Sequence, residues 1–195
     1  IMSNSHFDKK KRSTPRKKDN LYGDMLINKV VPLPMQNVGS NLLSNIKTYI
    51  ENEIEGKCIK EGYIKPDSIK IINYSNGVLQ DNYIIFQVVI ECKVCYPVEG
   101  QILNCFTKNI TKAGIKAEIR DDENNPLVIF VARDHNYLSK NFSNIKENEN
   151  LEVRVIGQRF ELNDTQISVI GTLVEGKSSK SKLKIKEDVE INIDN

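Results

Sequence analysis

The side chains in this chain best suited to metal binding or covalent chemistry are its cysteines. Cys92 and Cys95 have the CxxC spacing of many zinc sites. In an extended strand, however, residues three apart point to opposite faces, so both sulfurs could reach one ion only if the chain turned there. Cys58 and Cys105 do not form a second such pair. We therefore predict free thiols and no metal site.

The histidines and the acidic run do not suggest a catalytic centre either. His135 follows Asp134, but adjacency in sequence does not build a triad, and no GxSxG motif accompanies the pair. His6 lies in a basic segment. Residues 121–123 (Asp-Asp-Glu) could hold a hard cation, although an acidic turn between strands is commoner. With no glycine-rich phosphate loop, the sequence predicts a binding protein without a cofactor rather than an enzyme.

Charge is unevenly distributed along the 195 residues, whose net charge is +2. Residues 8–19 contain seven basic and two acidic side chains, so residues 1–20 are expected to be a disordered basic arm on a mildly acidic body. The arm is either a solvated tail or a contact for phosphate or an acidic protein. No apolar run approaches membrane-spanning length and no secretory signal is visible, which predicts an intracellular, reducing location.

Residues 21–96 are expected to form an α+β domain with one helix on an antiparallel sheet. Residues 25–34 resemble a strand ended by Pro32 and Pro34, because proline cannot donate to a ladder. Apolar residues from Leu42 to Ile54 recur at steps of three and four, which is typical of a helical face. The remaining strand candidates are residues 62–64, 68–74 and 83–95.

Residues 97–175 are expected to form a five-stranded OB-type barrel. A short helical link, residues 134–145, separates the third and fourth strands, as in barrels that bind oligonucleotides. The expected strands are residues 100–110, 115–120, 127–132, 151–160 and 165–173. Residues 176–195 form a charged tail whose alternation of lysine with apolar residues fits an added strand, an amphipathic piece or a plain tail.

Short motifs in both halves carry a resemblance to a known family. They are Pro32-Leu33-Pro34 with Gly39, Ile54-Glu55-Gly56-Lys57-Cys58, Gly62-Tyr63-Ile64, Tyr96-Pro97 with Glu99-Gly100, Lys112-Ala113-Gly114, Phe130-Val131-Ala132, Val153-Arg154-Val155-Ile156-Gly157 with Arg159, and Ile170-Gly171-Thr172. In order and spacing the chain resembles the large stalk subunit of multisubunit DNA-directed RNA polymerases, that is, the seventh subunit of RNA polymerase II and its archaeal counterpart. The Asn- and Lys-rich additions outside residues 22–174 fit a version from a large DNA virus.

The resemblance implies a non-catalytic subunit that pairs with polymerase core subunits and, in many members, with a smaller stalk subunit. The first domain would be a tip that docks on the core, and the second a ribosomal S-one-like barrel beside the emerging RNA. A cellular member would act in the nucleus, and a viral one in the virion and host cytoplasm. Docking is expected at an apolar surface formed by Pro32, Pro34, Gly39, Gly62, Tyr63 and Ile64.

RNA contact is expected to be weak. Residues 97–175 contain nine basic and twelve acidic side chains, the reverse of what phosphate neutralisation needs. The second strand also begins with Ile115-Lys116 where such barrels commonly place stacking aromatics. For the two phenylalanines the barrel interior is the favoured alternative, and for the basic residues an ordinary solvated face is equally open. The candidates are Phe106, Lys108, Lys116, Phe130, Arg133, Arg154 and Arg159.

Two other functions remain open from the sequence. A free-standing OB-fold RNA-binding protein of translation or RNA decay would use the same barrel and would bind RNA without a polymerase. An accessory domain of an enzyme could use the barrel to contact protein only. An exposed apolar surface on the first half would favour the stalk subunit.

Overall fold

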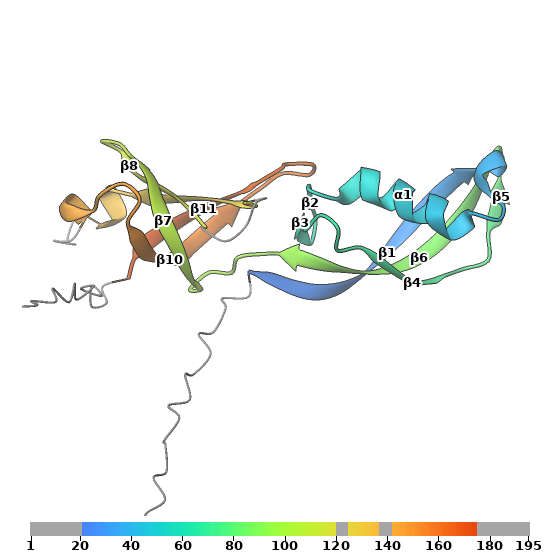
Figure 1. Ribbon diagram of the computed structural model, residues 1–195, viewed down its shortest axis with the longest axis horizontal. Coiled ribbons are helices and arrows are strands. Elements are labelled where there is room, and N and C mark those ends of the chain that lie inside the picture. Colours follow the sequence, from blue (N-terminus) through green and yellow to red (C-terminus); the bar gives the residue numbers. More distant parts are fainter. Residues whose placement is uncertain (1–20, 120–124, 137–141, 175–195) are drawn as a thin grey trace, which may run out of the picture.

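The computed structural model describes residues 21–119, 125–136 and 142–174, which form two parts lying end to end (Figure 1). The first part, called here the helix–sheet part, is an antiparallel sheet with one α-helix. The second is a closed barrel. The predicted arm, tail and acidic run at 121–123 lie outside the described residues.

Strand β6 (Tyr83–Cys95) is the centre of the helix–sheet part. β1 (Tyr22–Pro34) pairs with it antiparallel along its whole length. On its other side β6 pairs with three short strands, β3, β4 and β5, at successive positions along its length. β2 pairs with β3 and forms the outer edge there. The short strands are β2 (Cys58–Ile59), β3 (Gly62–Ile64), β4 (Lys70–Tyr74) and β5 (Val78–Gln80).

Helix α1 (Leu42–Ile54) follows a short 3-10 helix, η1 (Met35–Asn37). Its Ile46, Ile50 and Ile54 are spaced by four residues and are fully buried in the core of the helix–sheet part. Burial of each such side chain contributes about 1.5–3 kcal/mol. The helix ends before Gly56, whose φ of +69° suits a residue without a Cβ atom. The predicted helix is confirmed.

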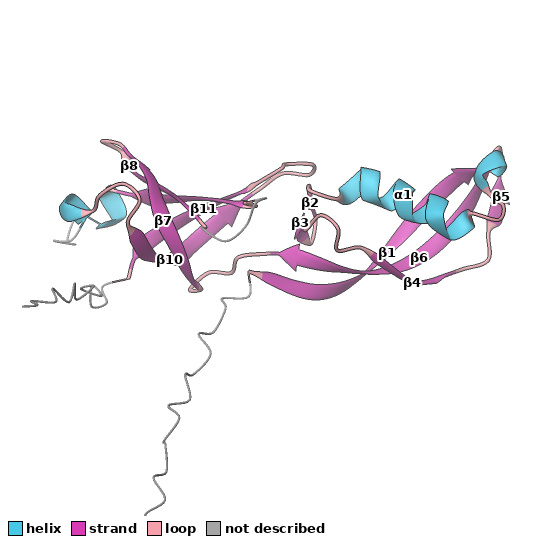
Figure 2. Cartoon of the chain, in the orientation of Figure 1, coloured by secondary structure: helices cyan, strands magenta, loops and turns pink. Residues whose placement is uncertain are grey.

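Figure 2 shows that the second part consists of strands and short helical segments. Its barrel closes in the order β10-β11-β9-β8-β7, and β9 and β11 form a parallel pair. This is the OB arrangement, so the predicted α+β and OB-type fold is confirmed. The link between the third and fourth strands contains two 3-10 helices, with residues 137–141 outside the described residues. The elements are β7 (Ile102–Ile110), β8 (Gly114–Glu118), β9 (Leu127–Ala132), η2 (Asp134–Asn136), η3 (Phe142–Asn144), β10 (Asn150–Arg159) and β11 (Ile167–Leu173).

Candidate functional site

Phe106 and Phe130 lie on the outer wall of the barrel, on β7 and β9. Their neighbours Cys105, Ile129 and Val131 are buried in the interior, so the alternation of a strand turns the two rings outward. Both rings are partly exposed. The interior location favoured from sequence is therefore wrong for these phenylalanines, and they are available on a surface.

Basic side chains accompany the two rings on this wall. Lys116 on β8 lies opposite Phe130, and Glu118 on the same strand lies opposite Phe106. Lys108 is at a bulge in β7 and forms an ion pair with Glu118, with 2.6 Å between Nζ and Oε1. Within the described part of the chain, Lys116 forms no ion pair. Lys116 is thus the cation on this wall best able to contact a phosphate. We call Phe106, Lys116 and Phe130 the barrel face.

The three predicted arginines come from other segments than the barrel face. Arg133 precedes η2 and its guanidinium is 5.3 Å from the centroid of the Phe142 ring, within cation–π range. Arg154 is on β10, beside Thr172 of β11. Arg159 ends β10 and pairs with Glu161 at 3.2 Å. The seven candidates therefore come from β7, β8, β9, β10 and the segment that follows β9.

Ile170 and Ile156 are exposed apolar residues that sequence analysis missed. Ile170 lies beside Phe130 on the neighbouring strand and is 45% exposed, and Ile156 is 40% exposed at the bulge of β10. The signal was present in β11, where Ile170 occupies the same outward register as Ser168 and Thr172. An isoleucine in a polar register indicates a contact surface.

η1, β5 and the start of α1 meet at the end of the helix–sheet part farthest from the barrel (Figure 1). Several large apolar side chains are exposed on these elements. Pairing brings Tyr83 opposite both Pro34 and Gln80 at this end. We call the exposed members the distal residues, and their relative exposures run from 49% to 65%. They are Met35, Leu43, Val78, Leu79 and Tyr83. Such exposure is typical of an interaction site.

A groove of about 680 Å³ lies beside the distal residues, between α1 and the paired ends of β1 and β6. It contains Pro32 and Pro34, two of the residues expected to dock, and no charged side chain. Its remaining lining residues are Leu33, Asn37, Asn45, Thr48, Tyr49, Asn52 and Tyr83. A neutral, mostly apolar groove suits a protein segment better than a nucleic acid, which requires positive charge.

Of the other expected docking residues, only Gly39 lies at the same end, between η1 and α1. Gly39 is in the exposed turn before α1. Gly62, Tyr63 and Ile64 form β3 at the opposite end of the part, where all three are buried. A Cβ atom at Gly62 would lie 2.5 Å from the carbonyl oxygen of Cys95, so only glycine fits there. Tyr63 packs with the barrel core, so these three residues lie at the junction of the two parts rather than at the distal end.

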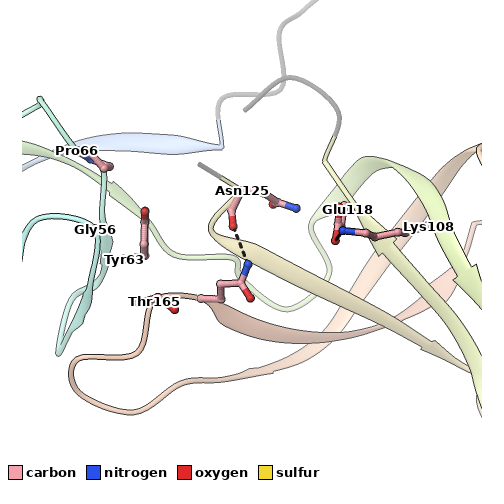
Figure 3. Close-up of a pocket in the computed structure, with 8 residues that line it drawn as sticks. Gly56, Tyr63, Pro66, Lys108, Glu118, Asn125 and Thr165 are labelled. Atoms are coloured by element: carbon pink, nitrogen blue, oxygen red, sulfur yellow. Dashed lines mark hydrogen bonds and ion pairs between the residues drawn. The ribbon is translucent and has the colours of Figure 1, made fainter. Parts of the chain in front are cut away.

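An open cleft of about 480 Å³ lies where the two parts meet (Figure 3). Gly56, Tyr63 and Pro66 line it from the helix–sheet part, and the Lys108–Glu118 ion pair lies on the barrel side. Asn125, Thr165 and Gln166 complete it, and Gln166 Nε2 donates to the carbonyl oxygen of Asn125 at 3.2 Å. The cleft connects this junction with the wall that carries Phe106.

Comparison with protein-family models found no match. Two curated proteins are similar over most of the chain. One is L376 of Acanthamoeba polyphaga mimivirus, assigned as a DNA-directed RNA polymerase subunit, which is 28% identical over 166 residues, or 77% of this chain and 80% of that protein. The other is the DNA-directed RNA polymerase II subunit RPB7 of Glycine max, 26% identical over 152 residues, or 69% and 82%. The chain is therefore similar to RPB7-type subunits of DNA-directed RNA polymerases over more than two thirds of its length.

The four cysteines, all in the described part of the chain, form no disulfide and are buried. Burial raises the pKa of Cys92 to about 11 and that of Cys105 to about 12. Cys92 packs in the core of the helix–sheet part and Cys95 packs with the barrel core, which confirms that the two sulfurs point in different directions. Among the described residues, no three histidine, cysteine or acidic side chains form a group that could hold a metal ion. No helix in the described ranges is long and apolar enough to cross a membrane.

Proposed function

We propose that this RPB7-type chain is a non-catalytic stalk subunit that docks on a polymerase core through the distal residues and the adjoining groove. The observation that carries the proposal is the location of these residues. Large apolar side chains are exposed at the end of the molecule farthest from the barrel. Docking there would leave the barrel projecting from the core, because the two parts lie end to end.

The barrel would then lie near the emerging RNA and contact it weakly through the barrel face. Two partly exposed phenylalanine rings beside Lys116 could stack with bases and neutralise one phosphate. The acidic balance of residues 97–175 favours a brief, local contact over tight binding. RNA contact would guide the transcript without any chemical step.

A smaller stalk subunit could cover apolar residues along the connection between the two parts. Tyr96 and Val98 are exposed in the connection, and Ile102 and Ile156 are exposed on the strands beside it. Backbone bonds between Gly100 and Val155 and between Val155 and Gln101 hold the connection against β10. Together these side chains form an apolar strip that would favour a protein partner. The subunit would act wherever its polymerase acts, in the nucleus or in the virion and host cytoplasm.

Native affinity purification of the tagged chain tests the proposal. We expect large polymerase subunits to be recovered with it, and Leu79→Asp to reduce that recovery at least about tenfold, since a buried charge in an apolar interface costs more than 1.4 kcal/mol. The matched control is Ile72→Asp, because Ile72 is also exposed in the helix–sheet part but lies on β4, away from the distal end. Recovery of RNA without polymerase subunits would instead support the free-standing RNA-binding protein.

A further inference from the structure

The connection between β10 and β11, residues 160–166, bonds directly to the helix–sheet part. The amide of Cys58 donates to the carbonyl oxygen of Asp164 at 2.7 Å, and the amide of Asn163 donates to the carbonyl oxygen of Cys58 at 2.8 Å. Cys58 is in β2, the outer strand of the sheet. The connection therefore satisfies backbone groups at an otherwise unpaired sheet edge, and it extends toward β2 in Figure 1.

The connection is shaped for this contact. The carboxylate of Asp164 accepts a hydrogen bond from the amide of Glu161 at 2.7 Å, and the amide of Asp164 donates to the carbonyl oxygen of Glu161 at 3.2 Å. Asn163 has a φ of +69°, a left-handed conformation that asparagine tolerates better than most residues. Both residue types thus hold the loop in the form that presents its backbone to Cys58.

Side chains on either side of the contact pack into one core. Cys58, Tyr63 and Cys95 belong to strands of the sheet, yet they are buried with the interior residues of the barrel. Phe160 meets Tyr96 edge to face, with 6.1 Å between ring centroids. Burial, together with the charge of Asp164, raises the pKa of Cys58 to about 11. Cys58 is therefore buried at the contact, whereas residues 161–166 of the connection face solvent.

We propose that residues 160–166 form a joint that fixes the orientation of the barrel relative to the helix–sheet part, with Asn163 and Asp164 as its positioning residues. The covalent connection at residues 96–101 alone would allow the barrel to swing. A second attachment on another strand removes that freedom. This inference rests on the proposed function for its purpose, since a fixed barrel would hold the barrel face in one direction from a docked distal end.

Alkylation of individual cysteines in the free protein tests the joint. Asn163→Pro removes the amide donor and cannot adopt a positive φ. We expect Cys58 to react with N-ethylmaleimide about tenfold faster, the change that loss of one hydrogen bond gives to local opening. Cys92 should stay protected in the core of the helix–sheet part, and Cys105 in the barrel interior, where its Sγ donates to the carbonyl oxygen of Leu151. Asn163→Gly, which keeps the amide and the left-handed conformation, should match the parent chain.

Asp164→Ala provides a second variant in case Asn163→Pro unfolds, an outcome that faster reaction of all the buried cysteines would reveal. It removes only the carboxylate that closes the loop, and faster reaction of Cys58 alone is again expected. Unchanged protection of Cys58 in folded Asn163→Pro and in Asp164→Ala would overturn the joint.

Purification with polymerase separates positioning from docking. The joint variants should recover polymerase as the parent does, while a photo-cross-linker placed at Lys116 should label a wider and weaker set of RNA positions. An unchanged cross-linking pattern would overturn the positioning role. If the parent chain itself recovers no polymerase, the proposed function fails, and the alkylation result still decides the joint.

Discussion

Glu55 is the carboxyl group whose surroundings depart most from those of a surface acid. It follows α1, and its Oε1 atom is buried with no hydrogen-bond partner among the described residues. Burial raises its pKa, and the negative charges of Glu51 and Asp67 add to the effect, while the backbone amides of Asp67 and Ile69 oppose it. The folded protein therefore binds a proton at Glu55 more tightly than the unfolded chain does.

This proton preference predicts a pH dependence of stability. The favourable contribution is complete below the ordinary glutamate pKa of about 4.3 and is lost as the pH rises through the raised pKa of the folded state. As the pH rises from the ordinary glutamate pKa through the raised one, the free energy of unfolding should therefore fall less for Glu55→Gln than for the parent chain. Urea unfolding at a series of pH values measures it.

The control for Glu55 is Glu147→Gln, which removes one carboxylate from an exposed site in the barrel. For this variant, the free energy of unfolding should change with pH as it does in the parent chain. If the free energy of unfolding changes with pH equally in the parent and in Glu55→Gln, the Glu55 carboxyl is solvated in the folded protein.

Single residues differed in how far the sequence could place them. The opposed directions of Cys92 and Cys95 follow from strand geometry alone, and the structure confirms them. Phe106 and Phe130 could not be placed, because a bulge in β7 and strand ends of unknown register decide which face each ring occupies. Tyr63 looked like a surface residue because β3 has only three residues, too few to show alternation.

Helix α1 contributes Ile50 to the core and Leu43 to the distal residues. Ile50→Ala should reduce the free energy of unfolding by about 2–5 kcal/mol, because Ile50 is fully buried between the helix and the sheet. Leu43→Ala on the same helix should change it by no more than about 0.5 kcal/mol, since Leu43 is half exposed. Urea unfolding measures both.

In native purification the order of the two α1 variants should be reversed, so that the variant with the smaller effect on stability has the larger effect on polymerase recovery. Leu43→Ala should lower polymerase recovery, whereas folded Ile50→Ala should retain it. A large loss of stability from Leu43→Ala would place that side chain in the core and remove it from the distal residues.

Helices and strands were predictable where they are long enough for the spacing of their apolar residues to repeat in the sequence. The helix and the five barrel strands show periods of about four and two residues, so their existence followed from pattern. β2 and β5 have two and three residues and were missed for that reason. The bonds from residues 163 and 164 to Cys58 join segments about a hundred residues apart, and no local pattern encodes them.

At the scale of the whole molecule, apolar contact and RNA contact are assigned to opposite ends. The groove beside the distal residues contains no charged side chain, whereas the barrel face pairs Lys116 with two aromatic rings. Composition alone predicted that RNA binding would be weak, because acidic residues outnumber basic ones in residues 97–175. The pairing register of β7, β8 and β9, which composition does not reveal, brings Phe106, Lys116 and Phe130 onto one wall of the barrel.

This arrangement predicts two separable effects on binding of single-stranded RNA at low salt. Phe130→Ala should weaken binding at least about fivefold at every salt concentration, because stacking contributes about 1–3 kcal/mol per base and is not screened. Lys116→Ala should reduce the slope of log affinity against log salt by about 0.7, the value for one phosphate contact on a single strand. Fluorescence anisotropy titrations at several salt concentrations measure both, with Lys70→Ala on β4 as the control for general charge. If neither variant differs from that control, the barrel face does not contact RNA, and the outward rings serve a protein partner instead.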